Sequence, residues 1–269
     1  MRDRTLWCIH LRITEENLRN KFTYLDVDFP IAFAHRGGAL DAPENSMAAF
    51  QSAVNIGYRY LETDVHLTSD GHVIAFHDDI LDRVTNLSGK VSQTPLPIIK
   101  TALIEERSEI PLLVELLTAF PQARFNIDPK SDRVAEPLAE VIKQAGATSR
   151  ICVSSFSDRR NHEISKLVGK GLCTGIGPSG VTRLRLGKFT NNSTVLNGQC
   201  VQVPTTIKGV PLITETFIDR VHSIGKAIHA WTINEPSEMH RLLDLGVDGI
   251  MTDKPLVLKE VLQSRNEWV

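Results

Sequence analysis

The chain has 269 residues, 42% of them hydrophobic, and a formal net charge of −2. This length suits two small domains or one large α/β domain with a substantial core. Charges of both signs are spread along the sequence, without the basic stripe that binds nucleic-acid phosphates, so nucleic acid is not an expected partner. No apolar stretch approaches the roughly 20 residues that cross a bilayer, so no transmembrane segment is expected.

Residues 1–29 are predicted to form an N-terminal extension. Their short apolar pieces are broken by His10, Arg12 and the pair Glu15–Glu16, and no small-residue cleavage site follows. The segment therefore does not resemble a signal peptide, and we expect a cytoplasmic protein.

The four cysteines are far apart in the sequence and lack the C-x-x-C spacing of metal sites. One is Cys8, in the extension. Cys152, Cys173 and Cys200 lie in apolar, strand-like runs, where a cysteine behaves as a small hydrophobic residue. We predict that packing role for them, with a disulfide or a nucleophilic thiol as the alternative.

From residue 30 onward, β-branched or aromatic runs alternate with stretches whose apolar residues recur three and four positions apart. Strands are predicted at 31–35, 60–67, 123–128, 150–156, 172–177, 200–204, 226–233 and 249–253. Eight strand–helix units predict a parallel sheet with crossover helices. Residues 30–269 are therefore expected to form one α/β domain, a (β/α)8 barrel, with an open doubly wound sheet as the alternative.

Two segments depart from this repeat. Residues 68–111 form a long insertion after the second strand, with a hairpin predicted around Asp70–Gly71. Residues 178–199, after the fifth strand, are rich in Gly, Asn and Ser, and we predict a surface loop there.

Polar side chains gather where the predicted strands end, which in a barrel is the catalytic face. The first three strands end in charged residues, and the last two also end in polar or aromatic ones. These residues are His35, Arg36, Glu62, Asp64, Asp128, Lys130, Trp231, Asn234 and Asp253.

Glu62 and Asp64 are two positions apart on a strand, so their carboxylates project from the same face. Asp128 on the neighbouring strand supplies a third oxygen ligand. Carboxylate oxygens suit one hard divalent cation, Mg²⁺ or Ca²⁺. The alternative is that these acids form ion pairs with Arg36 and Lys130.

His77 lies on the insertion, and with His35 it would flank such a cation. One imidazole could act as general base and the other as general acid. Arg36 and Lys130 would neutralise an anionic substrate, because a guanidinium is well matched to phosphate oxygens. Together these groups favour hydrolysis of a phosphate ester. Gly37 and Gly38, next along the chain, are expected to let the backbone approach the substrate closely.

The other histidines receive less specific predictions. His66 and His72 lie near the predicted cluster and are given no role. The remaining four are expected to be structural: His162, His222, His229 and His240.

The segment "AHRGGALDAPENSMAAFQSAVNIGYRYLETDVHLTSDGHVIAFHDDILDRVT" resembles the signature region of the glycerophosphodiester phosphodiesterase family. That pattern combines HRG, PENS with an Ala-Phe helix, Glu-x-Asp-Val, Thr-x-Asp-Gly and His-Asp. The resemblance continues in "FNIDPK", "HAWTIN" and "GVDGIMTDKP", so it spans roughly residues 31–256.

This resemblance implies a TIM-barrel enzyme that cleaves small glycerophosphodiesters to an alcohol and glycerol 3-phosphate. It implies His35 and His77 as the acid–base pair, with the substrate's neighbouring glycerol hydroxyl as nucleophile and a cyclic phosphate as intermediate. The metal carboxylates correspond to Glu62, Asp64 and Asp128. The phosphate-binding cations are those of Arg36 and Lys130.

Two departures from the family pattern affect the expected substrate and metal. The third ligand is commonly Glu and here is Asp128, and the run after His77 is not the usual Arg-Thr-Thr. Glu44 is expected behind the site or as a helix N-terminal acid. Trp231 is predicted to contact the apolar or choline part of a substrate, with a core role as the alternative.

Two other functions remain open. A lysophospholipase D would share the chemistry but act on a substrate with one acyl chain. A non-catalytic barrel that binds phosphodiesters is expected to have lost a histidine or a ligand, and none is lost here. The sequence leaves the oligomeric state undetermined.

Overall fold

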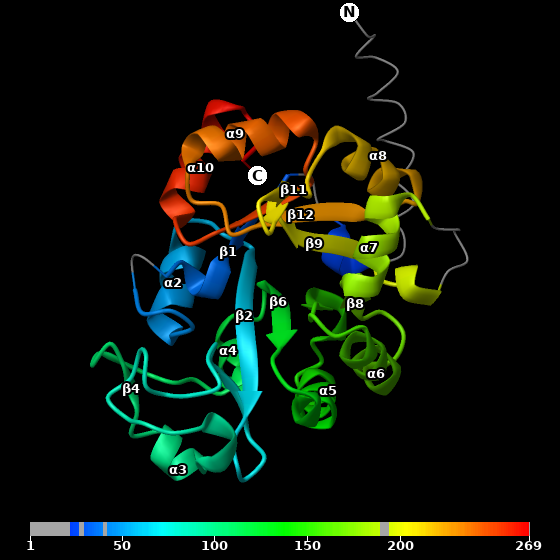
Figure 1. Ribbon diagram of the computed structural model, residues 1–269. Coiled ribbons are helices and arrows are strands. Elements are labelled where there is room, and N and C mark those ends of the chain that lie inside the picture. The colour runs from blue at the N-terminus through cyan, green and yellow to red at the C-terminus, as the bar shows by residue number, and fades with distance from the viewer. Residues whose placement is uncertain (1–21, 27–29, 40–41, 189–193, 269) are drawn as a thin grey trace, which may run out of the picture.

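The computed structural model describes residues 22–26, 30–39, 42–188 and 194–268 (Figure 1). In this part of the chain, eight parallel strands follow one another in the order β8-β7-β6-β2-β1-β13-β12-β9. The two end strands meet at a parallel bridge between Gly175 and Cys200, which nearly closes the sheet. The predicted (β/α)8 TIM barrel is therefore confirmed. The strands are β1 (Ile31–Ala34), β2 (Tyr60–Leu67), β6 (Arg124–Pro129), β7 (Ile151–Val153), β8 (Cys173–Thr174), β9 (Cys200–Pro204), β12 (Ala227–Trp231) and β13 (Gly249–Thr252).

One helix follows each barrel strand and covers the outside of the sheet (Figure 1). Side-chain caps begin several of them; for example, Ser46 Oγ accepts a hydrogen bond from Ala49 N at 3.1 Å. Gly246, in the left-handed conformation, ends another. The helices are α2 (Met47–Asn55), α4 (Leu113–Ala119), α5 (Ala135–Gln144), α6 (Asp158–Val168), α7 (Pro178–Leu186), α8 (Glu215–Ser223), α9 (Pro236–Leu245) and α10 (Pro255–Ser264).

The insertion after β2 has a small core of its own. The predicted hairpin is present: β3 (Val73–Ala75) pairs antiparallel with β2. Buried Ile74, Phe76, Leu81, Ile99 and Ile104 pack together beneath the rest of the insertion. Phe76 N donates to Asp64 O at 3.0 Å, so the insertion returns to the strand ends. Its other elements are η3 (Val91–Gln93), α3 (Leu96–Ile99), β4 (Leu103–Ile104) and β5 (Ser108–Glu109).

The predicted surface loop at 178–199 is wrong for its first half, which forms α7. Pro178 begins this helix at a position that needs no N–H donor, and Gly187 ends it in the left-handed conformation. Gly180 is required by close packing, because a Cβ there would lie 2.4 Å from both Ile176 and the Val195 carbonyl. The glycines that suggested a loop therefore serve helix packing and termination.

Part of the predicted N-terminal extension packs inside the barrel. Tyr24 and Leu25, in η1 (Thr23–Leu25), are fully buried against barrel residues such as Phe33 and Tyr60. The Tyr60 hydroxyl donates to Tyr24 O at 2.5 Å. Residues 1–21 and 27–29 lie outside the described residues, so the domain boundary at residue 30 stays a prediction.

The remaining elements are short. They are η2 (His35–Gly37), η4 (Asp132–Val134), η5 (Thr148–Arg150), η6 (Thr194–Leu196), β10 (Thr206–Ile207) and β11 (Val210–Pro211). Among the described residues, no helix is both long and apolar enough to span a bilayer.

Candidate active site

A pocket of about 360 Å³ opens at the C-terminal ends of the barrel strands. All eight residues that the sequence predicts for the site line it: His35, Arg36, Glu62, Asp64, His77, Asp128, Lys130 and Trp231. The pocket therefore lies where the predicted strand ends come together.

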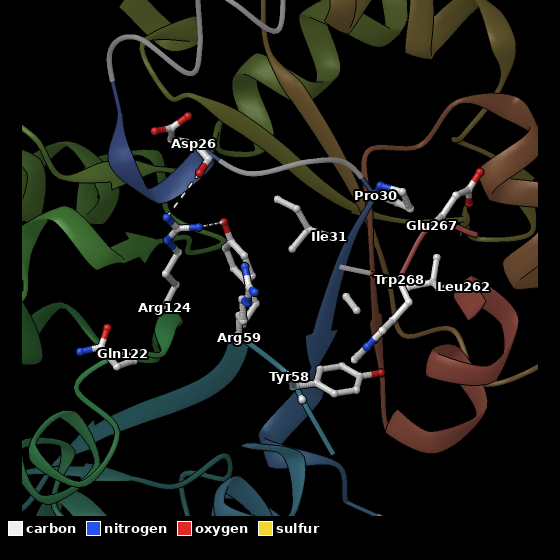
Figure 2. Close-up of a pocket in the computed structure, with 13 residues that line it drawn as sticks. Asp26, Pro30, Ile31, Tyr58, Arg59, Gln122, Arg124, Leu262, Glu267 and Trp268 are labelled. Atoms are coloured by element: carbon white, nitrogen blue, oxygen red, sulfur yellow. Dashed lines mark hydrogen bonds between the residues drawn. The ribbon is translucent and has the colours of Figure 1, made fainter. Parts of the chain in front are cut away.

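A second cavity, of about 510 Å³, lies at the opposite end of the barrel (Figure 2). Tyr58 and Arg59 in its wall come just before β2, and Gln122 comes just before β6. Arg124 there is held by Tyr60 Oη and by the carbonyl of Asp26. None of the predicted site residues lines this cavity.

His35 is fixed in orientation by a carboxylate. Its Nδ1–H donates to Asp253 Oδ1 at 2.6 Å, and its Nε2 lies 3.8 Å from Glu62 Oε2. Burial lowers the pKa of His35, but the neighbouring Glu62 and Asp253 carboxylates outweigh it and raise the pKa overall. The edge of the ring with Nε2 is thus the one presented to the pocket.

The backbone after His35 turns sharply. Arg36 adopts a left-handed conformation, with φ of 51°, and its N–H donates to Glu62 Oε2 at 3.0 Å. A Cβ on Gly37 would lie 2.8 Å from that of Ala49 in α2, and a Cβ on Gly38 would lie 2.5 Å from Pro255. The prediction that these glycines let the backbone approach the substrate is wrong. They instead let α2 and α10 pack closely against this turn.

The three acids occupy different electrostatic environments. Burial, and then the nearby Asp64, raises the pKa of Glu62 to about 7. Asp64 is also buried, but Lys130 and Arg36 hold its pKa below the usual range. Burial raises the pKa of Asp128, although Lys130 opposes it.

Asp64 is the centre of the charged network. It lies 2.6 Å from Lys130 Nζ, which also donates to Asp128 Oδ2 at 2.8 Å. Arg36 Nε is 3.3 Å from Asp64 Oδ2, and Asn45 Nδ2 donates to that oxygen at 3.1 Å. The alternative of ion pairs with Arg36 and Lys130 is thus present in the structure.

The three carboxylates have the right chemistry for a hard cation but are not drawn together as a ligand set. In the described part of the chain, they do not form a group whose ligand atoms all lie within 4.8 Å of one another. The Lys130 ammonium stands between Asp64 and Asp128. A divalent cation would fit if Lys130 turned away, because the all-oxygen donor set then faces the pocket.

His77 is held in the same way as His35, by a different carboxylate. Its Nδ1–H donates to Asp78 Oδ1 at 2.5 Å, and His66 Nε2 donates to the His77 carbonyl at 3.0 Å. Arg83 pairs with both Asp78 and Glu44. These contacts fix the insertion over the pocket.

Comparison with known proteins identifies the chain. The model of the glycerophosphoryl diester phosphodiesterase family matches residues 35–257. The chain belongs to this family. It is therefore placed among the phosphoric diester hydrolases, as the resemblance implied. 

Three relatives illustrate the likeness. The chain is 39% identical over 244 residues to a "probable glycerophosphodiester phosphodiesterase 2" of Mycobacterium tuberculosis, covering 88% of this chain and 92% of that protein. It is 30% identical to a lysophospholipase D of Mus musculus, covering 86% and 85%. A phosphodiesterase of Oleispira antarctica, solved with the product sn-glycerol-3-phosphate, superposes with a TM-score of 0.74 at 23% identity, covering 87% and 97%.

The pocket of this family member has an apolar half opposite the charged one. Phe156 follows β7, Val181 belongs to α7, Ile207 to β10, and Trp231 ends β12. The rings of Phe156 and Trp231 meet edge to face with centroids 5.7 Å apart. Phe156 is 70% exposed and Ile207 51% exposed, so this apolar wall continues onto the rim.

Several functional residues were not assigned from the sequence. Asp253 was recognised only as a polar strand end, and Asp78 was not singled out at all. Asn45 Oδ1 accepts from Thr63 Oγ1 at 2.7 Å while its amide holds Asp64. Glu44, expected behind the site, joins Arg36 to Arg83 at 3.0 and 2.6 Å. The one sequence signal for Asp78 is its position next to His77.

Proposed function

We propose that this chain hydrolyses glycerophosphodiesters to an alcohol and glycerol 3-phosphate with the help of one divalent cation. The observation that carries the proposal is the paired arrangement of His35 and His77. Each lines the charged half of one pocket, and each has Nδ1 held by its own carboxylate, Asp253 or Asp78. This pairing keeps the Nε2 edge of both rings available for proton transfer.

In the proposed reaction, one imidazole removes the proton from the glycerol hydroxyl next to the phosphate. That oxygen attacks phosphorus, and the other imidazole protonates the departing alkoxide of the alcohol. Water then opens the cyclic phosphate with the two proton transfers reversed. Arg36 and Lys130 stabilise the negative charge on the phosphate oxygens.

Glu62, Asp64 and Asp128 would hold the cation, either Mg²⁺ or Ca²⁺. When bound, it supplies a Lewis acid for the phosphate oxygens. Lys130 then turns from the acids toward the substrate phosphate. Support for this exchange comes from its present position between Asp64 and Asp128, a place of strong negative potential.

Removal and return of metal test this function. Protein treated with chelator and freed of it should lose hydrolysis of glycerophosphocholine, and added Mg²⁺ or Ca²⁺ should restore it. Full activity without any divalent cation would overturn the metal assignment. Tight binding of glycerophosphocholine without turnover would instead favour the non-catalytic barrel.

Affinity for the cation should fall in acid. Below its pKa of about 7, Glu62 carries a proton that an incoming cation must displace. The apparent dissociation constant for Ca²⁺, measured calorimetrically, should therefore rise by about tenfold per unit of pH below 7 and level off above it. Glu62→Gln should remove this slope. An equal slope in that variant would assign the proton to another group.

A second candidate, lysophospholipase D activity, is favoured by the apolar half of the pocket. An acyl chain would lie along Phe156 and Ile207, which are exposed at the rim in line with the pocket. The likeness to the mouse lysophospholipase D supports this candidate.

Ile207→Ser should separate the two substrates. It should lower kcat/KM for lysophosphatidylcholine by about 5- to 10-fold, because burying an isoleucine against an acyl chain contributes about 1.5–3 kcal/mol when complete. Glycerophosphocholine should be hydrolysed as before. Val210→Ser is the matched control: Val210 pairs with Ile207 across the same hairpin and is 60% exposed, but does not line the pocket. Equal losses on both substrates would contradict an acyl-binding role.

The cytoplasmic location stays a prediction. The substrate we propose is a small molecule.

A further inference from the structure

Three cysteines that are far apart in the sequence meet inside the barrel. Cys152 in β7 pairs in register with Cys173 in β8, and Cys200 begins β9 on the other side of β8. All three side chains are fully buried, and their sulfur atoms lie within 4.8 Å of one another. Among the described histidine, cysteine and acidic side chains, they form the one group of three close enough to share a metal ion.

The sulfur spacing is that of a tetrahedral metal site. At a metal–sulfur distance of about 2.3 Å, two thiolates on a tetrahedral ion lie about 3.8 Å apart. Cys152 Sγ and Cys200 Sγ are 3.7 Å apart. A disulfide needs only about 2.05 Å between the sulfurs, so none of these three cysteines is in a disulfide, and the 3.7 Å contact is an S–H···S hydrogen bond.

Two buried polar atoms beside the sulfurs lack partners. His229 Nε2 and Tyr24 Oη are fully buried, and neither has a hydrogen-bond partner in the described ranges. His229 lies near Cys200, and Tyr24 lies near all three cysteines. Buried polar atoms are rarely left unsatisfied, so the surroundings of the sulfurs are incomplete as they stand.

The His229 ring is held on its Nδ1 side and on one face. The Gln202 amide nitrogen lies 3.2 Å from Nδ1 and also donates to Asn126 Oδ1 at 2.8 Å, and the ring packs against Phe33 with centroids 4.9 Å apart. Ligation through Nε2 would leave the ring proton on Nδ1. The Gln202 oxygen would accept that proton if the amides of Gln202 and Asn126 turned over together.

We propose that Cys152, Cys173 and Cys200 form three ligands of a structural site for one thiophilic divalent ion of the Zn²⁺ class, with His229, which lies outside this group of sulfurs, as the fourth ligand once its ring moves toward them. Four protein ligands leave no open position, which is typical of a structural site. As each metal–sulfur bond forms, an S–H bond breaks and its proton passes to solvent. Lys226 adds positive charge near Cys173, which offsets part of the charge of the thiolates.

Such a site would stabilise the barrel where β8 and β9 close the sheet. Strands β8 and β9 are joined by the Gly175–Cys200 bridge, and β8 is only two residues long. The ion would tie β7, β8, β9 and β12 together there. The proposed metal site lies inside the barrel, among the packed residues of the strands. Its role is independent of the proposed phosphodiesterase chemistry.

Cobalt substitution tests the site without any activity assay. The full-length protein is produced in medium in which Co²⁺ replaces Zn²⁺, and its absorption spectrum is recorded after mild chelation. The expected result is one retained Co²⁺ per chain with sulfur-to-cobalt charge-transfer bands and the visible bands of a tetrahedral ion. Cobalt at the carboxylates gives no sulfur band, so failure of the phosphodiesterase proposal leaves this readout unchanged.

Cys200→Ser should lose the sulfur band, whereas Cys8→Ser, at a cysteine outside the described residues, should keep it. If Cys200→Ser does not fold, the wild-type protein decides the question. Wild type without the band, without bound zinc or cobalt by mass spectrometry, and with four titratable thiols after unfolding would overturn the proposal. Two fewer thiols without metal would overturn it as well, in favour of a disulfide.

Discussion

Replacing His35 with alanine is expected to lower kcat for glycerophosphocholine by about 10²–10⁴-fold, because one of the two proton transfers loses its side chain. The turnover rate measured at saturating substrate and cation tests this. His72→Ala is the matched control, since that histidine is half-exposed in the turn before β3 and lies outside the pocket. An activity within a few-fold of wild type in His35→Ala would remove His35 from the reaction.

The pH profile of Asp253→Asn distinguishes proton transfer by His35 from a merely structural role. The Asp253 carboxylate helps to raise the pKa of His35, so its removal should lower that pKa. If His35 acts as the base, the acid limb of kcat/KM should move to lower pH in the variant. A rate that falls with an unmoved acid limb would mean that Asp253 acts only by holding the fold.

Asp64→Ala is expected to have the second large effect, on both activity and stability. The substitution leaves the largely buried cations of Lys130 and Arg36 without the carboxylate that lies between them. Breaking a buried pair costs up to about 3–5 kcal/mol, and the pairs that Lys130 keeps with Asp128 and Arg36 keeps with Glu44 reduce this loss. Chemical denaturation should show this loss in the free energy of unfolding, together with loss of turnover.

Two variants serve as controls for Asp64→Ala. Asp79→Asn, at a side chain that is 88% exposed on the insertion, should change neither stability nor activity. Asp64→Asn keeps the shape and should recover part of the stability but none of the activity. Full activity in Asp64→Asn would contradict a metal-binding role for this residue.

The sequence predicted the pocket well because parallel strands end together. Alternation along β2 places Glu62 and Asp64 on one face, and the neighbouring register of β6 places Asp128 beside Asp64. The positions of these three acids therefore follow from the alternation along a strand and from the pairing of neighbouring strands. His77 could be named but not placed, since its location depends on β3 returning antiparallel along β2.

The parts that could not be predicted depend on side chains from distant segments. Asp253 meets His35 only because β13 lies next to β1 in the closed barrel. The sequence predicts Cys152, Cys173 and Cys200 as separate small hydrophobic residues, which agrees with their burial. Their meeting depends on β8 lying between β7 and β9, a neighbourhood that spacing along the chain does not contain. In α7, glycine composition suggested a loop because the close packing at Gly180 is invisible in the sequence.

The proposed function requires that one pocket joins two carboxylate-held histidines to a cation site and cleaves glycerophosphodiesters. Phosphorus NMR of glycerophosphocholine incubated with the purified protein and either Mg²⁺ or Ca²⁺ tests it most directly. The glycerol 3-phosphate signal should grow, with an equal amount of free choline in the proton spectrum, and this growth should be at least about 100-fold slower in the His35→Ala and His77→Ala proteins. An unchanged glycerophosphocholine signal with both cations, or cleavage within a few-fold of the wild-type rate in both histidine variants, would contradict this function.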